Sequence, residues 1–269
     1  MHILLIIVLY KKSINELFYL NNIKQELDVL IYDNSPERQE APSDIYYYHN
    51  PLNVGVSAAY NYGIDLAEKI GKKYVVLLDQ DTVFDTEKLS YYKKAALKYG
   101  EDYIYAPICK NGDKIYSPFI EDRIGNHCQS KSDFVYKSVY DLKGKSLINS
   151  GLMIPLKIIK EVGKFNENIK LDFSDIYFIE LYKRKHQFII LLDVYLEHRL
   201  SGDEGKNKNK ELNRFKYYCN GAREYLKSTE NPSRIKKMVL FRMIRLIAKY
   251  KSITPIGILI DYYLGDKTV

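Results

Sequence analysis

A buried-strand pattern that ends in two acidic residues constrains the fold of this chain more than any other feature. Residues 74–78 are aromatic or aliphatic, and Asp79 and Asp81 follow them directly. An apolar run of this length is typical of a strand that is buried on both faces of a sheet. Open α/β sheets bind their ligands at the carboxyl ends of their strands. The run therefore predicts a parallel α/β sheet with paired carboxylates at its ligand-binding edge.

The spacing of the two carboxylates adds a condition. Asp79 and Asp81 are two positions apart, so they would point to opposite faces of the sheet if the strand continued. The strand must end or turn here for both side chains to serve one site. Carboxylates in such a position are costly unless a cation compensates them, and Mg²⁺ is commonly held by one or two carboxylates together with substrate phosphates. The pair predicts a divalent-metal site, although most isolated Asp-x-Asp sequences are solvated turns.

Length and composition limit the class of protein. The chain has 269 residues and 46% hydrophobic content, enough for one enzyme-sized domain with an appendage. It has no apolar run of about 18 residues, so no transmembrane helix is expected. Residues 2–9 lack the flanks of a signal peptide and are interpreted as a first core strand. Three scattered cysteines argue against a disulfide framework or a zinc site and favour a cytoplasmic setting. The net charge of +7 suits anionic partners such as nucleotide phosphates or a membrane surface.

The first hundred residues alternate between strand and helix patterns. Strands are predicted at 3–9, 29–32, 45–49 and 74–78, and helices at 13–26 and 57–70. Such alternation favours right-handed βαβ units and a parallel sheet. Further along, the patterns predict short strands and turns at 104–140, helices at 155–162 and 172–185, and an apolar strand at 188–197.

The C-terminal part has a different pattern. Residues 206–210 are a charged loop, and helical periodicity begins at residue 213. Residues 234–251 combine apolar and basic positions at helical spacing, which predicts a basic amphipathic helix. Such a helix either lies in a membrane interface or packs on the rest of the protein with its bases solvated, and both interpretations remain open. In the first, the apolar contacts are Phe241, Ile244, Leu246 and Ile247, and the bases that meet anionic head groups are Arg242, Arg245, Lys249 and Lys251.

The order of motifs along nearly the whole chain resembles a known family. The motifs are Tyr10 after the first strand, then IYDNS at 31–35, NVGVSAAYNYGI at 53–64, LLDQD at 77–81, NSG at 149–151, VGKF at 162–165, LDFSD at 171–175, EHRLSG at 197–202 and GILIDYYLG at 257–265. Together they are similar to a family 2 glycosyltransferase with the GT-A fold, specifically its rhamnosyltransferase-like branch. The resemblance implies an α/β fold, with a Rossmann-like, mostly parallel sheet flanked by helices and a C-terminal helical appendage.

The resemblance also implies how a nucleotide diphosphate sugar is bound. Tyr10 would contact the base or ribose. Asp33 would accept a hydrogen bond from the pyrimidine N3–H, with Asn34 beside it; the same two residues also fit a simple Asx turn.

The next motif would bind the diphosphate. Asn53 and Gly55 precede a helix whose N-terminus offers backbone N–H groups to anionic oxygens. Gly55 would let the backbone come close to the ligand. Asn61, inside that helix, would hydrogen-bond either the donor or only the loop.

In the family, the last aspartate of the Asp-x-Asp motif binds the divalent metal ion. Carried over, Asp81 would bind Mg²⁺ or Mn²⁺, and Asp79 would lie beside the sugar nucleotide. His198, just after the last apolar strand, matches a family histidine that faces the metal or the diphosphate, whereas a lone histidine elsewhere is more often structural. The ion would offset charge on the departing diphosphate.

Inversion at the anomeric carbon needs a general base that takes the acceptor hydroxyl proton. In many relatives this base belongs to an acidic pair at the start of a helix, ahead of an arginine. Here the candidates are Asp172 and Asp175. The spacing to the basic end of the helix favours Asp175 and puts Leu181 where relatives often carry the arginine. The other aspartate is expected to cap the helix.

These implications define an expected function. The chain is expected to be an inverting, metal-dependent glycosyltransferase, with rhamnose from dTDP-rhamnose as the leading donor and a UDP-hexose as the alternative. Its acceptor would be a saccharide carried on a polyprenyl diphosphate, used for capsule, O-antigen or another bacterial surface polysaccharide. A nucleotidyltransferase, which normally has a glycine-rich loop after the first strand, and a non-catalytic binding protein are the competing classes.

The expected organisation follows from the same reading. Residues 1–205 would form the catalytic domain, with a nucleotide-sugar half at 1–100 and an acceptor half at 101–205. Residues 206–269 would form a helical, membrane-proximal region. The protein would be peripheral at the inner face of the cell membrane, a homodimer is possible, and no nucleic-acid partner is expected.

Overall fold

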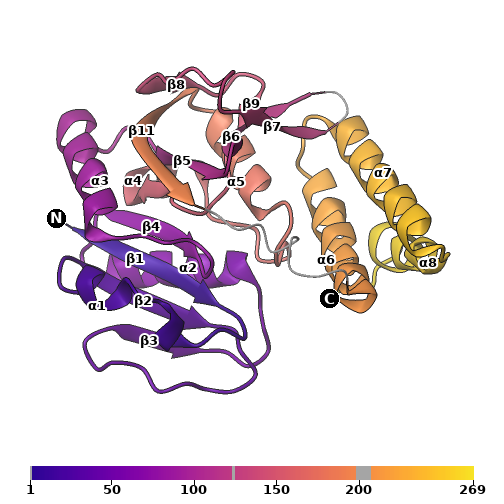
Figure 1. The fold of residues 1–269 in the computed structure, drawn as a ribbon, viewed down its shortest axis with the longest axis horizontal. Helices are drawn as coiled ribbons and strands as arrows, with labels where there is room; N and C mark the ends of the chain where they lie inside the picture. Colours follow the sequence, from indigo (N-terminus) through magenta and orange to yellow (C-terminus); the bar gives the residue numbers. More distant parts are fainter. Residues whose placement is uncertain (1, 123–124, 198–206) are drawn as a thin grey trace.

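The computed structural model describes residues 2–122, 125–197 and 207–269 (Figure 1). Its strands are β1 (Ile3–Leu9), β2 (Asp28–Asp33), β3 (Tyr46–His49), β4 (Tyr74–Asp79), β5 (Tyr105–Asn111), β6 (Lys114–Glu121), β7 (Asn126–Ser130), β8 (Val139–Asp141), β9 (Lys145–Ser146), β10 (Met153–Pro155) and β11 (Phe188–Glu197). Its α-helices are α1 (Leu20–Ile23), α2 (Val56–Lys69), α3 (Thr86–Tyr99), α4 (Leu156–Val162), α5 (Ser174–Lys183), α6 (Lys208–Leu226), α7 (Pro232–Tyr250) and α8 (Thr254–Leu259).

The central sheet has the strand order β3-β2-β1-β4-β10-β5-β11-β8, and β6, β7 and β9 extend it beside β5. Strands β1 to β4 are mutually parallel, and β5 pairs in parallel with β11. The short β10 runs antiparallel between β4 and β5. This confirms the predicted mostly parallel α/β sheet, and it brings the carboxyl ends of β1, β2 and β4 to one edge.

Both faces of the sheet are covered, as the apolar strands require. Every residue of β1 is buried, and successive side chains belong to two different cores. Leu4 and Ile6 pack with residues of α2, α4 and α5, whereas Leu5 and Ile7 pack with residues of α1 and α3. Two-sided burial explains why these strands read as continuous apolar runs rather than as alternating ones.

Two segments differ from the expected secondary structure. The helix predicted at 13–26 is a 3₁₀ turn (Ile14–Glu16) followed by the short α1. The capping box of Ser13 and Glu16 is present, but Asn21 and Asn22 favour turns over helix continuation. Helix α3, which was not predicted, is capped by Asp85, whose side chain accepts a hydrogen bond from the Lys88 N–H.

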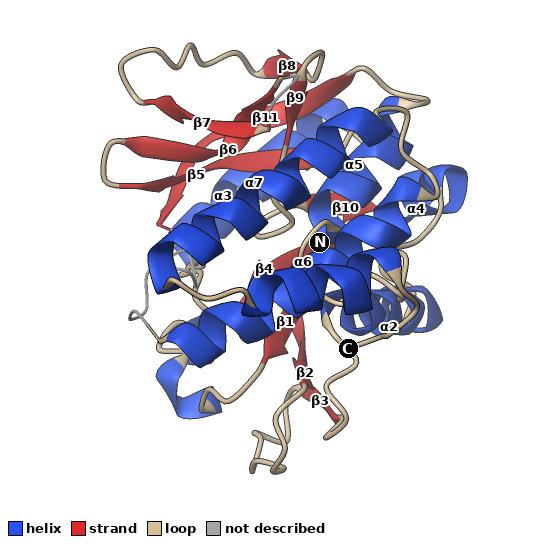
Figure 2. Cartoon of the chain, turned by 90° about the vertical axis from the view of Figure 1, so that its right-hand side faces the viewer, coloured by secondary structure: helices blue, strands red, loops and turns tan. Residues whose placement is uncertain are grey.

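Helices α6, α7 and α8 form the expected C-terminal appendage on the side of the molecule away from β1–β4 (Figures 1 and 2). Their apolar faces share a third core with the segment before α5; among its residues are Phe173, Phe215, Tyr225 and Val239. A π-helical turn (Ile260–Leu264) continues α8. None of the helices in the described ranges has the length and hydropathy needed to cross a membrane.

The orientation of α7 corrects the expected membrane face in three positions. Leu246 is buried in the third core. Arg242 lies over the Tyr218 ring at 4.1 Å from its centroid, and Lys249 forms an ion pair with Glu211. These side chains point toward α6 because they lie on the strip of α7 that packs on its neighbour. Phe241 and Ile244, by contrast, are exposed.

Candidate functional site

The loops after β1, β2 and β4 are tied together at the carboxyl edge of the sheet. The backbone N–H of Tyr10 donates to Gln80 Oε1 at 2.8 Å, and Lys12 Nζ donates to the Gln80 carbonyl at 2.7 Å. The backbone N–H of Lys11 donates to Ser35 Oγ at 2.8 Å. These contacts hold the candidate nucleotide residues beside the turn that follows β4. The Tyr10 side chain itself remains 40% exposed.

Strand β4 ends at Asp79, as the two carboxylates require. The chain turns at once, because the Thr82 N–H donates to the Asp79 carbonyl at 3.1 Å. Ser150 secures this turn: its Oγ accepts from the Asp79 N–H at 3.1 Å and lies 2.7 Å from Thr82 Oγ1. Asp81 therefore lies in the turn after β4 and not in the strand. The alternation of side chains along the strand does not direct it to the face of the sheet opposite Asp79.

A buried tyrosine connects the candidate carboxylates. Tyr60, in α2, donates its hydroxyl hydrogen to Asp79 Oδ1 at 2.9 Å. Burial raises the pKa of Tyr60 well above its ordinary value, and the negative charges of Asp79, Asp175 and Asp81 raise it further. Of the three carboxylates, Asp79 contacts the hydroxyl, and Asp175 and Asp81 lie near enough for their charges to act on it. Residues far apart in the sequence thus meet at the edge of the sheet.

Asp33 lies fully buried at the end of β2. Its carboxylate accepts hydrogen bonds from the Ser35 N–H at 2.9 Å, from Gln39 Nε2 at 2.9 Å and from the Tyr47 hydroxyl at 2.8 Å. Burial alone would raise the pKa of Asp33, but these bonds outweigh it and lower that pKa. Three of the roughly four acceptor positions of the carboxylate are therefore used within the protein. The hydrogen bond from the Ser35 N–H closes an Asx turn, which was one of the two interpretations of Asp33 and Asn34 from the sequence.

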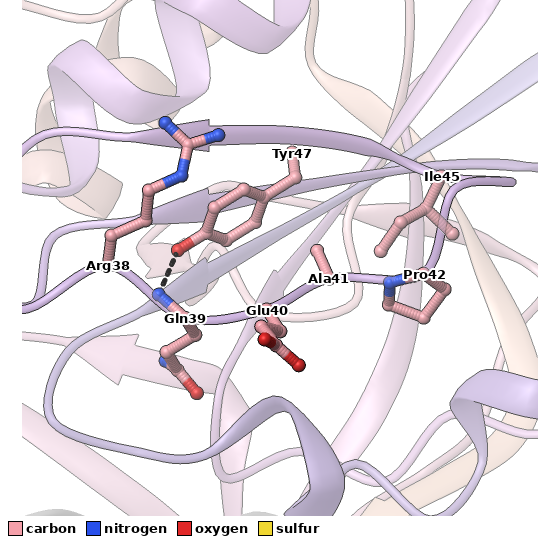
Figure 3. Close-up of a pocket in the computed structure, with 7 residues that line it drawn as sticks. All are labelled: Arg38, Gln39, Glu40, Ala41, Pro42, Ile45 and Tyr47. Atoms are coloured by element: carbon pink, nitrogen blue, oxygen red, sulfur yellow. Dashed lines mark hydrogen bonds between the residues drawn. The ribbon is translucent and has the colours of Figure 1, made fainter.

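An open depression of about 610 Å³ lies beside Asp33 (Figure 3). Its lining residues are Arg38, Gln39, Glu40, Ala41, Pro42, Ile45 and Tyr47. In its wall the Gln39 N–H donates to the Tyr47 hydroxyl at 3.0 Å, and the Arg38 guanidinium lies 5.5 Å from the Tyr47 ring centroid. Its lining residues include none of the candidate catalytic and metal-binding residues Asp79, Asp81 and Asp175. The depression therefore adjoins the candidate nucleotide site and is not the reaction centre.

Gly55 makes a close approach to protein backbone at the start of α2. Its φ is +92°, and an added Cβ would lie 2.3 Å from the Lys170 carbonyl oxygen. The Val56 N–H donates to the same oxygen at 2.7 Å. One backbone N–H at this helix N-terminus is thus bound within the protein. Asn53, just before it, adopts a φ of +47°, and the buried Asn34 donates weakly to the Gly55 carbonyl at 3.4 Å.

Gly55→Ala is expected to destabilise the fold by about 2 to 4 kcal/mol, because the left-handed backbone and the clash with Lys170 add together. Gly71→Ala is the matched control. Gly71 follows the other end of α2 with a φ of +71°, and nothing lies within 4 Å of an added Cβ. It should cost about 1 kcal/mol. Urea unfolding measures both, and equal costs would show that Lys170 does not constrain Gly55.

Asn61 bonds the loop that follows α4. Its Nδ2 donates to the Phe165 carbonyl and to Glu167 Oε1, both at 2.9 Å, and its Oδ1 accepts from the Phe165 N–H at 3.1 Å. The side chain is buried. Of the two alternatives that the sequence left open, the structure supports the loop contact.

Asp172 is bound by an arginine from the C-terminal helices. Arg214, in α6, donates from Nε to Asp172 Oδ2 at 2.8 Å and from a terminal nitrogen to Oδ1 at 3.1 Å. Arg242, in α7, lies 3.8 Å from the same Oδ1. The expectation that Asp172 caps α5 is wrong: the N-cap is Phe173, whose side chain makes no capping hydrogen bond. The Asp172 carboxylate cannot reach the helix end because two guanidinium groups hold it elsewhere.

Asp175 lies in the first turn of α5. Its Oδ1 accepts a hydrogen bond from the Ile176 N–H at 2.8 Å. Burial, together with the charges of Asp172 and Asp79, raises the pKa of Asp175 to about 7 against the lowering effect of the hydrogen bond from the Ile176 N–H. A carboxyl group with this pKa both ionises and takes up a proton near neutral pH.

The donor set at this edge suits a hard divalent cation. Asp79 and Asp81 supply carboxylate oxygens, and Mg²⁺ needs only one or two of these when substrate phosphates complete its shell. Within the ranges that the structure describes, no group of three or more histidine, cysteine or acidic residues is arranged to hold a metal by itself. His198 lies outside the described residues, so its predicted role stays a prediction.

Three residues of this site were not assigned roles from the sequence. Tyr60 and Ser150 lie inside the quoted motifs, so their position in those motifs was an available signal. Arg214 lies far along the chain in a helix with many basic residues, and nothing local distinguishes it from them. Only the packing of α6 against the segment before α5 brings it to Asp172.

Comparison with known proteins adds a family and a fold. A family model described as glycosyl transferase family 2 matches residues 19–155. The solved structure of S. aureus TarS 1–349 in complex with UDP-GlcNAc is similar with a TM-score of 0.53 and 15% identity, over 97% of this chain and 79% of that chain. Bifunctional IspDF from Campylobacter jejuni has a TM-score of 0.41 and 12% identity, over 71% and 49% of the two chains. No curated protein sequence matches the chain.

Proposed function

The chain belongs to glycosyl transferase family 2, and from this premise we propose that it transfers a sugar, with inversion, from a nucleotide diphosphate donor to a saccharide acceptor. The observation that carries this proposal is the hydrogen bond from Tyr60 to Asp79 at the end of β4, with Asp81 in the same turn and Asp175 near enough for its charge to act on Tyr60. Asp79 and Asp81 suit a metal-bound diphosphate, and Asp175 suits a general base. The GT-A-like sheet supplies the edge on which they converge.

Asp175, rather than Asp172, is proposed as the general base. The bidentate bond from Arg214 occupies an acceptor position on each oxygen of Asp172. The charge of Arg214 also acts on Asp175, but none of the described ion pairs joins them, and the pKa of Asp175 is raised to about 7. A base with this pKa is ionised often enough to act and basic enough to take the acceptor hydroxyl proton. Asp172 then holds the segment that carries Asp175.

The donor would bind across the carboxyl ends of β1, β2 and β4. Asp81, with Asp79 beside it and His198 as a further candidate ligand, would hold Mg²⁺ or Mn²⁺ against the diphosphate. When bound, the ion offsets negative charge on the leaving group. Tyr60 orients Asp79 through its hydrogen bond, and Ser150 fixes the turn that carries both acids.

The base of the donor would lie over Tyr10 and the turn at 33–35. Asp33 is buried and accepts three internal hydrogen bonds, so we assign it chiefly to shaping this turn. The N3–H contact that the resemblance implies, with a donor that uracil and thymine share, would require this fully buried carboxylate to become accessible. dTDP-rhamnose stays the leading donor, because the branch resemblance points to it. A UDP-hexose is the alternative, supported by the UDP-GlcNAc bound to TarS.

The remaining assignments rest on the resemblance. Residues 1–100 would bind the donor, residues 101–205 would shape the acceptor site, and residues 206–269 would form a membrane-proximal region. The acceptor would be a saccharide on a polyprenyl diphosphate at the inner face of the cell membrane, used for a bacterial surface polysaccharide.

A panel of nucleotide sugars tests the proposal. With Mg²⁺ or Mn²⁺ present, one donor is expected to be hydrolysed or transferred, with dTDP-rhamnose first and UDP-hexoses next. Nucleoside triphosphates with sugar phosphates serve as the control for nucleotidyl transfer. Turnover of none of the diphosphate sugars, with either ion, would contradict the enzymatic assignment.

The pH dependence of kcat/KM should report the Asp175 carboxyl. Below its pKa of about 7 the base is protonated, so kcat/KM should fall about tenfold per pH unit as the pH drops and reach a plateau above the midpoint. A bound cation favours the carboxylate and would move this midpoint lower. Initial rates between about pH 5 and 9 measure it, and a flat profile would contradict the assignment of Asp175.

A further inference from the structure

The outer surface of α7 is apolar at its centre and basic around it. Seven exposed residues of α7 and its C-cap recur three or four positions apart and therefore lie on one side of the helix. They are Lys237, Leu240, Phe241, Ile244, Arg245, Ala248 and Lys251. Leu240, Phe241 and Ile244 expose 47%, 53% and 49% of their area. We call these seven residues the outer face of α7.

A second exposed apolar strip lies on the neighbouring helix α8 and its extension. It consists of Ile253, Ile256, Ile260 and Leu264, which are exposed by 78%, 40%, 54% and 69%. Their spacing of three or four residues puts them on one side of α8 and its π-helical extension. Residues of α7, α8 and this extension share the third core, so the two helices are neighbours. Figure 1 places both at the edge of the molecule farthest from β1–β4.

The charge around these apolar residues has one sign. Residues 231–260 contain no aspartate or glutamate. Lys237, Arg245 and Lys251 border the apolar side chains of the outer face and are exposed. A two-fold contact between copies through this face would place these bases against one another, which is unfavourable. An anionic surface complements them instead. The apolar centre favours a partner that also accepts hydrocarbon side chains.

We propose that the outer face of α7, together with the apolar strip of α8, docks on an anionic lipid bilayer. Aromatic and aliphatic side chains would enter the acyl boundary while the bases meet the head groups. This differs from the face expected from the sequence, because Leu246, Arg242 and Lys249 are engaged within the protein. The attachment is reversible and peripheral.

The side of α7 opposite its outer face contacts the candidate active site. Arg242 reaches Asp172 from that side, 3.8 Å from its Oδ1, three residues before the proposed base. Asp172, at the border of the candidate site, therefore lies about one helix diameter, roughly 10 Å, behind the docked face. An acceptor whose reactive end projects from the bilayer would meet the site at this height. That consequence rests on the proposed function, whereas docking itself does not.

Vesicle co-sedimentation without donor or acceptor tests the docking separately from catalysis. The wild-type protein should pellet with phosphatidylglycerol vesicles at low salt, much less at high salt, and little with phosphatidylcholine vesicles. The double variant Phe241→Gln/Ile244→Gln should bind at least about tenfold more weakly. Phe18→Gln/Leu97→Gln is the matched control, since these side chains are 88% and 85% exposed elsewhere, and it should bind like the wild type.

A charge series tests the head-group contacts. Lys237→Gln/Arg245→Gln/Lys251→Gln should weaken binding by about two orders of magnitude, since one base near an anionic surface contributes about fivefold. Lys69→Gln/Lys94→Gln/Lys114→Gln removes the same charge from exposed positions elsewhere and should have much less effect. Circular dichroism and thermal melting verify that each variant is folded.

Three outcomes would overturn the proposal. The wild type could stay in the supernatant with anionic vesicles at low salt. The variant Phe241→Gln/Ile244→Gln could pellet with anionic vesicles to the same extent as the control Phe18→Gln/Leu97→Gln. Sedimentation equilibrium without lipid could also show a wild-type dimer that Phe241→Gln/Ile244→Gln dissociates, which would make a second copy the occupant of this face.

Discussion

Asp175→Asn is expected to lower the rate of sugar transfer by about two to four orders of magnitude, the range typical of losing a general base. The amide keeps the size of the side chain and can still accept the Ile176 N–H bond, but it cannot take the acceptor proton. Donor binding should persist, because Asp175 is not assigned to the diphosphate. Transfer kinetics together with calorimetric titration of the donor separate the two effects.

Asp172→Asn is the matched control for this prediction. It removes the charge that Arg214 and Arg242 bind and leaves two cations facing a neutral amide. Its main effect should therefore be lower stability in urea unfolding, with transfer reduced less than in Asp175→Asn. If Asp172→Asn is inactive while Asp175→Asn turns over normally, the base has been assigned to the wrong carboxylate.

Asp81→Ala is expected to abolish metal-dependent binding of the donor. The diphosphate would then lose the cation that links it to the protein, and its charge would face Asp79 without compensation. Calorimetric titration with the nucleoside diphosphate, with and without Mn²⁺, measures this loss. Asp102→Ala, at an exposed position that pairs with Lys157, removes an equal charge away from the site. Unchanged Mn²⁺-dependent binding by Asp81→Ala would show that the ion is held elsewhere.

The C-terminal helices are part of the site's architecture as well as an appendage. Phe173, between the two candidate bases, has a left-handed φ of +75°, a conformation that costs free energy for a bulky side chain. Its ring packs 4.7 Å from that of Tyr218 in α6, measured between centroids. Arg214 bonds the preceding residue from the same helix. Contacts from α6 therefore stabilise the backbone that presents Asp175.

Local patterns predicted the sheet and the chemistry at its edge. The apolar runs at 3–9 and 74–78 are buried strands, because such runs satisfy a sheet covered on both faces. Helix α2 follows Gly55, and β4 ends at Asp79 as the spacing of the two acids required. Each of these features depends on residues within one element or its immediate turn, so the sequence alone contained the necessary information.

Contacts between distant segments decided the rest. The spacing within the motif favoured Asp175 over Asp172, but the contact that distinguishes them is made by the guanidinium of Arg214, which α6 brings from another part of the chain. The loop contact of Asn61 and the backbone contact of Gly55 with Lys170 depend on the segment that follows α4.

The amphipathic pattern of α7 was visible in the sequence, but the side of the helix that remains exposed was not. Leu246 and Ile244 are equally apolar, yet packing on α6 buries the first and leaves the second 49% exposed. Sequence periodicity determines which residues share a face of a helix. Only the tertiary structure decides which face meets a neighbour, because the free energy of burial depends on what the rest of the chain places there.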